Sequence, residues 1–192
     1  MTDNTHHSAP VPVGDVVPGD LPVPITVWPV PAPQPGETMS NAMGVRLVHN
    51  LTHLGGLVVD LTDGPQLARA VIAASRRRQL TSGRQVGWGR ESASLIVTGW
   101  PLPGEPASPA EFFDRCRARL LPGGCIAVLL AHGDLTLPVD VIIAAKQARL
   151  GYLQHIVAAD PPPRRGTPNR LDLHTDVLIL TRSMAQIGGA DD

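Results

Sequence analysis

Short apolar runs alternate with segments of helical periodicity along most of the chain. Five runs have the length and composition of buried strands: 57–61, 93–98, 125–130, 153–159 and 174–181. Apolar residues recur at helical spacing before and between these runs, over 38–54, 65–78, 108–121 and 134–150. Only a loop separates the last two runs, so these strands should pair antiparallel. The pattern predicts an α/β fold with a mostly parallel sheet and an antiparallel closing strand.

Local signals place the ends of several of these helices. Ser40 or Asn41 is a suitable N-cap for the first helix, and the Gly55-Gly56 pair ends it. Ser108, followed by Glu111 three residues later, has the spacing of a capping box. These signals support the predicted alternation of helices and strands.

The same periodicity assigns side chains to the core and to the helix ends. In the last two predicted helices the inward-facing residues are Phe112, Phe113, Cys116 and Leu120, and then Val139, Ile142, Ile143 and Ala145. Three arginines, residues 76–78, close the helix predicted over 65–78, where positive charge complements the helix dipole. The alternative for these arginines is an edge that binds phosphate.

Residues 1–37 differ from the rest of the chain because they are rich in proline. Proline removes main-chain donors and favours an extended polyproline conformation, so we expect a mostly disordered or draped arm. Its one apolar cluster is 25–28. The arm is either a linker or a contact for the body or for a protein partner. We expect the α/β domain to span 38–183 and a flexible tail to follow over 184–192.

Composition excludes several classes of protein. No apolar run approaches the roughly 18 residues that span a bilayer, and the N-terminus has no secretory signal pattern. The two cysteines, Cys116 and Cys125, fit a reduced and cytoplasmic protein. Residues 38–190 hold all 16 basic residues and 11 acidic ones, which permits contact with DNA or RNA without requiring it.

The segment 55–64 is the pivot of this pattern. A short apolar strand reaches Asp60, a Thr62-Asp63-Gly64 turn follows, and a helix begins near Pro65. A buried strand, a tight turn and a helix start form the opening unit of a nucleotide-binding α/β fold. The candidate cofactor-binding residues are therefore Asp60, Thr62, Asp63 and Gly64.

The later junctions extend the pattern. A helix ends in Leu-Pro-Gly-Gly before the strand 125–130, and a Gly151-Tyr152 turn and a closing strand over 176–180 follow. Over about residues 40–182 this order resembles the class I S-adenosylmethionine-dependent methyltransferases. It is most similar to the DNA amino-methyltransferases that act on adenine N6 or cytosine N4, and to related RNA methyltransferases. The resemblance implies a Rossmann-like sandwich, S-adenosylmethionine as cofactor and a nucleic acid as substrate.

The cofactor turn of that family reads roughly Asp-Pro-Phe-x-Gly-x-Gly, and this chain matches it only in part. Asp60 and Gly64 match, whereas Leu61 and Thr62 replace the Pro and the Phe. Gln66 stands in place of the second glycine, where a side chain can obstruct the close approach of a cofactor to the main chain. The family also places an acid after its second strand for the ribose hydroxyls, and residues 79–90 contain none.

The catalytic motif of the family is Asp/Asn/Ser-Pro-Pro-aromatic, and its place here is taken by Gly99-Trp100-Pro101-Leu102. Chemistry on an exocyclic amine needs an oxygen acceptor to align the amine and an aromatic face to hold the flipped base. Gly99 carries no acceptor, Leu102 has no aromatic face, and Trp100 is displaced by one or two positions. Only Pro101 matches, so the candidate catalytic position lacks the groups for the chemistry.

Three further groups of residues have alternative interpretations. The stretch 160–163 resembles the catalytic motif in letters, but we interpret it as a rigid loop, with a substitute catalytic loop and phosphate contacts from Arg164, Arg165 and Arg170 as the alternative. The stretch 132–134 is a turn with a helix cap or part of a pocket. His49 and His53 have metal-ligand spacing on a helix, but no third ligand accompanies them.

Three functions are consistent with the sequence. The first is a degenerate methyltransferase-like domain, weakly active or inactive, that serves as a binding or regulatory module. The second is an active S-adenosylmethionine-dependent DNA or RNA amino-methyltransferase with atypical motifs. The third is an unrelated α/β assembly protein that engages a partner through its Pro-rich arm. No metal is expected in any of them.

Overall fold

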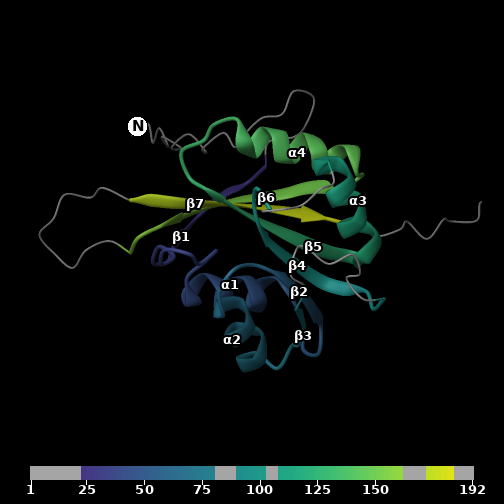
Figure 1. Ribbon diagram of the computed structural model, residues 1–192, viewed down its shortest axis with the longest axis horizontal. Helices are drawn as coiled ribbons and strands as arrows, with labels where there is room; N and C mark the ends of the chain where they lie inside the picture. The colour runs from purple at the N-terminus through teal and green to yellow at the C-terminus, as the bar shows by residue number, and fades with distance from the viewer. Residues whose placement is uncertain (1–22, 81–89, 103–107, 162–171, 184–192) are drawn as a thin grey trace, which may run out of the picture.

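A computed structural model of the protein describes residues 23–80, 90–102, 108–161 and 172–183. Its centre is a seven-stranded sheet with the strand order β1-β6-β7-β5-β4-β2-β3 (Figure 1). The strands are β1 (Ile25–Pro29), β2 (Leu57–Leu61), β3 (Arg77–Leu80), β4 (Ala93–Gly99), β5 (Leu120–Ala131), β6 (Gly151–Ala159) and β7 (Leu173–Thr181). The helices are α1 (Asn41–Leu51), α2 (Gln66–Ala73), α3 (Pro109–Arg119) and α4 (Leu137–Gln147).

The strand directions agree with the sequence pattern. Strand β7 runs antiparallel to both of its neighbours, β5 and β6, whereas the other pairs are parallel. The predicted α/β fold with a mostly parallel sheet and an antiparallel closing strand is therefore confirmed. Because the parallel strands point the same way, the ends of β2, β4 and β5 meet at one edge of the sheet, which we call the carboxyl edge; the opposite edge is the amino edge.

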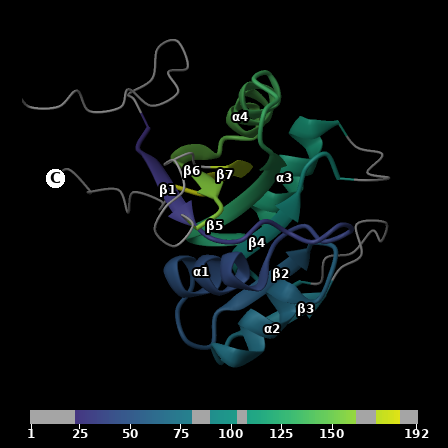
Figure 2. The ribbon, with the colours of Figure 1, turned by 90° about the vertical axis from the view of Figure 1, so that its left-hand side faces the viewer.

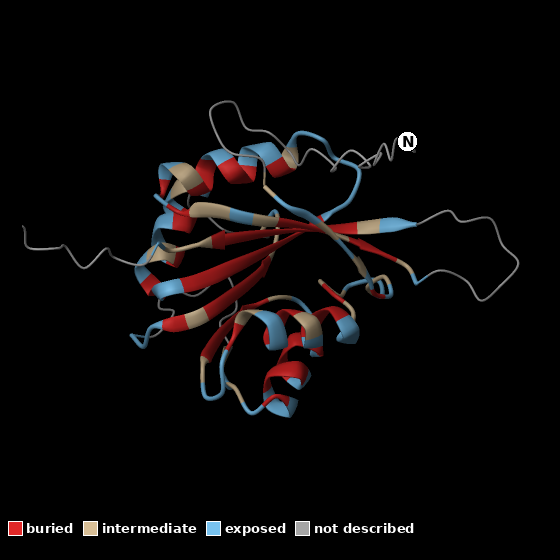
Figure 3. Cartoon of the chain, turned by 180° about the vertical axis from the view of Figure 1, so that it is seen from behind, coloured by how far each residue is buried: buried red, intermediate tan, exposed pale blue. Residues whose placement is uncertain are grey.

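Helices cover the sheet on both faces, with α1 and α2 on one side and α3 and α4 on the other (Figure 1). Each face has its own buried cluster. One cluster joins Phe112 and Phe113 of α3 to Ile142 of α4, and the other joins Leu47 of α1 to Leu67 of α2. The strands between them are buried along most of their length (Figure 3). Four of the predicted core residues, Phe112, Phe113, Cys116 and Leu120, are fully buried.

The predicted N-terminal caps are confirmed, whereas α1 ends at Leu51 with Thr52 as its C-cap, before the Gly55-Gly56 pair that was predicted to end it. The Ser40 hydroxyl accepts a hydrogen bond from the Met43 amide at 3.4 Å, and Ser108 and Glu111 form a reciprocal capping box. A hydroxyl or carboxylate at these positions satisfies amides that have no partner within the helix.

The Pro-rich leader contributes a strand, which corrects the expectation of a mostly disordered or draped arm for residues 25–29. Strand β1 lies at the sheet edge and pairs in parallel with β6, in register from Ile25 opposite His155. The Val30 amide and the Pro24 carbonyl point toward β6, so the nitrogen of Pro29 points toward the open side. Proline is tolerated on an edge strand because the missing donor has no partner to lose. Residues 1–22 lie outside the described residues, and the domain boundary at 37 stays a prediction.

The sequence pattern predicted that the arginines of 76–78 close a helix, and this prediction is wrong. Helix α2 ends at Ala73, Ser75 adopts a φ of 55°, and Arg77 begins strand β3 beside β2. A short, charged edge strand lacks the apolar run that marks the central strands. For this reason the sequence pattern predicted the end of a helix here instead of a strand. These side chains belong to the strand and its turns, and the argument from the helix dipole does not apply to them.

The inward face of α4 also differs from the prediction at two positions. Ile142 and Ala145 are buried as expected, but Val139 and Ile143 are each a little under half exposed. The buried face is instead completed by Pro138 and Val141. Cys116 and Cys125 are both buried, and no disulfide bond joins them. Within the described ranges, no helix has both the length and the apolar character that a membrane span requires.

Candidate functional site

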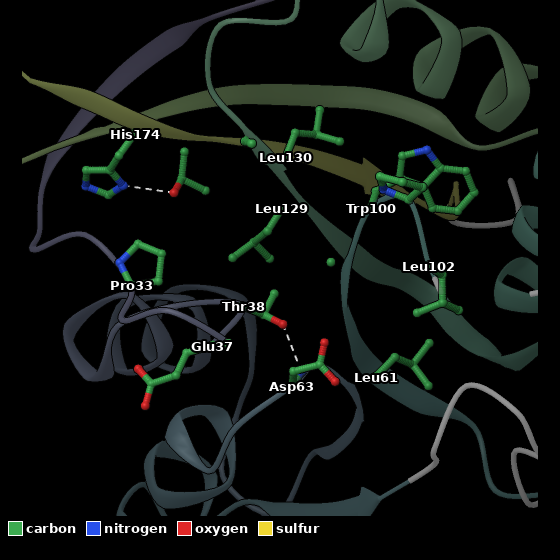
Figure 4. A pocket seen from close by; sticks show the side chains of 15 residues that line it. Pro33, Glu37, Thr38, Leu61, Asp63, Trp100, Leu102, Leu129, Leu130 and His174 are labelled. Atoms are coloured by element: carbon green, nitrogen blue, oxygen red, sulfur yellow. Dashed lines mark hydrogen bonds between the residues drawn. The ribbon is translucent and has the colours of Figure 1, made fainter. Parts of the chain in front are cut away.

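A cavity of about 340 Å³ lies at the carboxyl edge of the sheet (Figure 4). It is open to solvent and is bordered by the segment between β1 and α1, the turn after β2, the chain after β4 and the adjoining ends of β5 and β7. The residues that line it are Pro33, Gly36, Glu37, Thr38, Leu61, Asp63, Gly99, Trp100, Pro101, Leu102, Leu129, Leu130, Ala131, His174 and Thr175. The structure therefore brings Asp63 of the predicted cofactor turn and all four residues of the predicted catalytic position to one cavity.

Asp60 is part of the turn but not of the described cavity lining. It is buried, and its Oδ1 atom accepts hydrogen bonds from the amide and the hydroxyl of Thr62 at 3.1 and 2.7 Å. Its Oδ2 atom lies 3.3 Å from Nε of Arg78. Both carboxylate oxygens are therefore engaged within the chain, and Asp60 fixes the turn and joins it to β3.

Asp63 is exposed and its carboxylate points toward the cavity (Figure 4). Its main chain is paired with Thr38, which precedes α1. The Asp63 amide donates to the Thr38 hydroxyl at 2.8 Å, and the Thr38 amide donates to the Asp63 carbonyl at 3.1 Å. This pair closes the turn against the segment between β1 and α1.

Gly64 is exposed, but the side on which a side chain would project faces Gln66. A Cβ atom added there would collide with Oε1 of Gln66 and would lie 3.4 Å from Cγ of Glu37. Gln66 is only 3% exposed, and its Oε1 atom has no hydrogen-bond partner within the described part of the chain. The Gln66 side chain thus lies over the glycine.

The chain after β4 is fixed by packing and by one main-chain bond. The Trp100 indole stacks on Phe113 with ring centroids 5.5 Å apart and meets Phe112 at 5.3 Å, while the Trp100 amide donates to the Leu129 carbonyl at 2.9 Å. A Cβ atom at Gly99 would lie 3.0 Å from Cγ2 of Thr38. Thr38 therefore lies against both the Asp63 turn and Gly99.

The sequence pattern did not predict that the segment before α1 and the start of β7 contribute residues to the cavity. His174 donates from Nε2 to the Val30 carbonyl at 3.0 Å, and its Nδ1 lies 2.8 Å from the Thr175 hydroxyl. Glu37 lines the cavity beside Thr38. No motif marks these residues, because they lie far in sequence from the turn and approach it only through the sheet order.

The stretch 160–163 has a structural role at its first residue. Oδ1 of Asp160 accepts a hydrogen bond from the Ala32 amide at 3.0 Å, which holds the chain beyond β1. Asp160 does not line the cavity described above. The prolines at 162 and 163 and the arginines Arg164, Arg165 and Arg170 lie outside the described residues.

A second polar cluster lies beside the same edge, on Asp176 of β7. Its Oδ2 atom is 2.8 Å from Nδ1 of His132, and its Oδ1 atom is 3.0 Å from Nε2 of His155. Burial opposes ionisation of Asp176, but the hydrogen bonds from His155 and His132 outweigh it, so the pKa of Asp176 lies below the ordinary value.

The turn that follows His132 has the role expected from the sequence. Oδ1 of Asp134 accepts hydrogen bonds from the amides of Thr136 and Leu137, at 2.9 and 3.1 Å, where α4 begins. The Thr136 amide and then the Leu137 amide hold the pKa of Asp134 below its ordinary value. The predicted turn at 132–134 is present and Asp134 accepts from the first amides of α4, although the N-cap position of that helix is Thr136.

The cavity has an apolar wall and an acidic rim. Among the lining residues described above, the charged ones are Glu37 and Asp63, and none is Lys or Arg. Within the described residues there is also no group of three His, Cys, Asp or Glu side chains placed to hold a metal ion. His49 and His53 are both exposed on or near α1.

Comparison with known proteins identifies the fold. No protein-family model matches the sequence, and no curated protein is significantly similar to it. Solved structures do match. A chain from the complex between the Haloferax volcanii Trm112 methyltransferase activator and a methyltransferase is 11% identical, with a TM-score of 0.52 over 75% of this chain and 89% of that one.

Two further structures are methyltransferases from Pyrococcus furiosus and Thermoplasma acidophilum, each 14% identical with a TM-score of 0.50. They cover 79% and 84% of this chain, and 87% and 68% of their own. The chain therefore has the Rossmann-like fold of the methyltransferases. None of the three is described as a DNA amino-methyltransferase, so that narrower resemblance stays a prediction.

The fold makes S-adenosylmethionine the cofactor to compare with these residues. In the family turn, a glycine at the position of Gln66 would leave the main chain open to the cofactor. Here the Gln66 amide lies against one side of Gly64, and the Asp60 carboxylate is engaged by Thr62 and Arg78. The turn therefore departs from the family turn at the second glycine, and its first acid is engaged within the chain.

Proposed function

We propose that this chain is a methyltransferase-like binding domain in which methyl transfer is weak or lost. The position of Gln66 over Gly64 is the observation that supports this most strongly. The same side chain is buried and packed at the start of α2, so it is not a flexible surface group that a ligand displaces at no cost. A domain of this kind serves as a binding or regulatory module rather than as a catalyst.

The chain after β4 supports the same proposal. Methyl transfer to an amine requires an acceptor that aligns the nucleophile. Gly99 has no side chain, and the space beside it is taken by the Thr38 methyl group. The cofactor turn thus has Gln66 in place of a glycine, and the position that would orient the substrate has no acceptor.

Isothermal titration calorimetry with S-adenosylmethionine, combined with a radiolabelled methyl-transfer assay on DNA and RNA, tests this proposal. We expect no micromolar binding and no transfer by the parent protein. A Gln66→Gly variant should gain affinity, whereas Gln66→Glu, which keeps the bulk, should not. Micromolar binding accompanied by methyl transfer in the parent protein would overturn the proposal.

An active amino-methyltransferase with atypical motifs is the second candidate. One observation favours it: Asp63 and Gly99 to Leu102 line the same cavity at the edge where α/β proteins bind ligands. In that case Asp63, rather than the internally engaged Asp60, would contact the cofactor. Asp63→Ala would then abolish binding in the same calorimetric experiment without changing the melting temperature.

A protein partner that binds through residues 1–37 also stays a proposal. Residues 25–29 of this leader form the outer strand of the sheet, with Val27 about half exposed. One of the solved structures with this fold comes from a complex with a methyltransferase activator, which makes a protein partner worth testing. Size-exclusion chromatography with light scattering, with and without residues 1–22, measures its contribution; an unchanged monomer in both would count against it. A nucleic-acid partner and a cytoplasmic location remain predictions.

A further inference from the structure

The segment from Val30 to Thr38, which we call the strap, passes over the carboxyl edge of the sheet. It leaves β1 at the outer edge and runs past β5 and β4 toward α1 (Figure 2). Four of its residues, Pro33, Gly36, Glu37 and Thr38, line the cavity together with the ends of β4 and β5. The strap is thus one wall of the candidate binding site, although it is part of neither the cofactor turn nor the catalytic motif.

The strap is anchored at its first end by three hydrogen bonds. The Val30 amide donates to the Ala159 carbonyl and the Val30 carbonyl accepts from His174, both at 3.0 Å. The Ala32 amide donates to Asp160 at 3.0 Å. Val30 itself is 1% exposed and packs in the core below α1. This end is part of the folded body.

The middle of the strap is held differently. Within the described part of the chain, residues 33–37 form one hydrogen bond, from the Glu37 amide to the Gln34 carbonyl, which is internal. Gly36, in this turn, has a φ of 82° and is exposed. The next bonds to the body are the two between Thr38 and Asp63, and the Asp63 residue is exposed.

We propose that the strap is a gate over the cavity, closed by the Thr38–Asp63 pair. Separation of this pair would release the Thr38 side chain from Gly99 and lift residues 33–37 while Val30 stays anchored. The inference rests on the proposed function, because it assumes that this cavity is the ligand site. It adds that the strap has two positions. The structure shows the one in which Thr38 is paired with Asp63, and a ligand enters when the pair is separated.

The two functions of the Thr38 side chain are separable by substitution. Thr38→Val keeps the shape beside Gly99 but removes the hydroxyl that accepts from the Asp63 amide. Thr38→Ser keeps the hydroxyl and removes the methyl group beside Gly99. Loss of one hydrogen bond shifts an opening equilibrium by about 5- to 10-fold. The valine variant should therefore open the gate more often, and the serine variant serves as its matched control.

A cysteine inside the cavity reports opening directly. Leu129 lines the cavity and is 3% exposed, so Leu129→Cys should react with iodoacetamide only when the gate opens. The protein without this substitution gives the background from the two buried native cysteines. We expect labelling of the reporter to be about 5- to 10-fold faster with Thr38→Val and to change little with Thr38→Ser. Equal rates in the parent and the valine variant would overturn the gate.

Amide hydrogen exchange of the unmodified protein provides a test that does not depend on the folding of a variant. The Asp63 amide, bound to Thr38, should exchange much faster than the Trp100 amide, which is bound to Leu129 within the sheet. Equal exchange rates would mean that the strap opens only on unfolding, which overturns the gate. Neither measurement requires a ligand, so a negative result leaves the proposed function standing. Conversely, micromolar binding of S-adenosylmethionine accompanied by methyl transfer in the parent protein overturns that function without affecting the gate.

Discussion

The charged residues at the two edges of the sheet are used in different ways. At the amino edge, arginine side chains donate to main-chain carbonyls: Arg76 to Thr52 and Ala74, Arg77 to Gly55, and Arg182 to Arg117 and Leu120. At the carboxyl edge the charged residues around the cavity are acids. Arginine side chains thus fasten the fold on one side, where Arg77 also pairs with Glu91, and two acids, Glu37 and Asp63, line the candidate site on the other.

This difference bears on the choice of ligand. Arginines that satisfy the last carbonyls of a helix or turn are not free to bind phosphate without a cost to the fold. The excess of basic residues in 38–190 is therefore a weaker argument for a nucleic-acid surface than the count alone suggests. Glu37 and Asp63 at the cavity also disfavour an anionic ligand there.

The largest expected effect comes from a covalent lock at the carboxyl edge. A Cβ atom at Gly99 would lie 3.9 Å from Cβ of Thr38, which suits a disulfide. The Thr38→Cys, Gly99→Cys double variant should therefore oxidise spontaneously and gain about 4 kcal/mol in the free energy of unfolding, because a long loop is closed.

Guanidinium denaturation with and without reductant measures the effect of this lock. The two single variants are its controls, since neither can form the bond. A double variant that remains reduced in oxidised glutathione would show that Thr38 and Gly99 are not adjacent in solution.

A smaller effect is expected from Asp176, which bonds to two histidines beside the same edge. Its side chain is 7% exposed, and Asp176→Asn removes the charge that His132 and His155 share. We expect a loss of about 3 kcal/mol in the free energy of unfolding at neutral pH. Urea denaturation measures it, with the exposed Asp114→Asn as control. A loss no larger than that of the control would contradict a stabilising role for the cluster.

The same variant should change the dependence of stability on pH. The folded pKa of Asp176 is below its ordinary value of 3.8, because the two histidine hydrogen bonds outweigh the burial that opposes ionisation. Its ionised form therefore adds stability above about pH 4, and this contribution is lost as the pH falls through the lower folded value. The parent protein should lose this part of its stability in acid, and Asp176→Asn should not.

At the amino edge, Arg182 provides the corresponding test. It donates to the carbonyls of Arg117 and Leu120 at the junction between α3 and β5. Arg182→Met keeps most of the apolar stem but leaves these carbonyls without their donor, so we expect a loss of about 2 kcal/mol in the free energy of unfolding. Arg69→Met, on the exposed side of α2, is the matched control. Similar melting temperatures for the two variants would contradict the prediction that Arg182 stabilises the fold more than Arg69 does.

The central strands were predictable because their signal is local. A strand buried on both faces is a continuous apolar run, and β2, β4, β5 and β7 each have one. The two edge strands lack it. Strand β1 lies among prolines and β3 begins with two arginines, so composition suggested a loose arm in one case and the end of a helix in the other.

The candidate site was less predictable because its contacts join distant residues. Thr38 and Asp63 are 25 residues apart, and Asp176 lies 44 residues from His132. No periodicity or motif carries that information, which depends on the order of strands in the sheet. Comparison of motifs did single out Gln66, because the substitution for glycine is visible in the sequence itself.

The smallest expected effect separates two acids of one turn. Asp60→Asn should cost about 1.5 kcal/mol in the free energy of unfolding, since it weakens the bonds to Thr62 and Arg78. Asp63→Asn should cost less than about 0.5 kcal/mol, because its carboxylate is exposed and only its main chain holds Thr38. Chemical denaturation of both variants measures the difference. The two residues are both aspartates of one turn, so they are matched controls for each other. A larger loss of stability for Asp60→Asn assigns Asp60 to the fold and leaves Asp63 available to a ligand. Equal losses of stability would contradict this assignment.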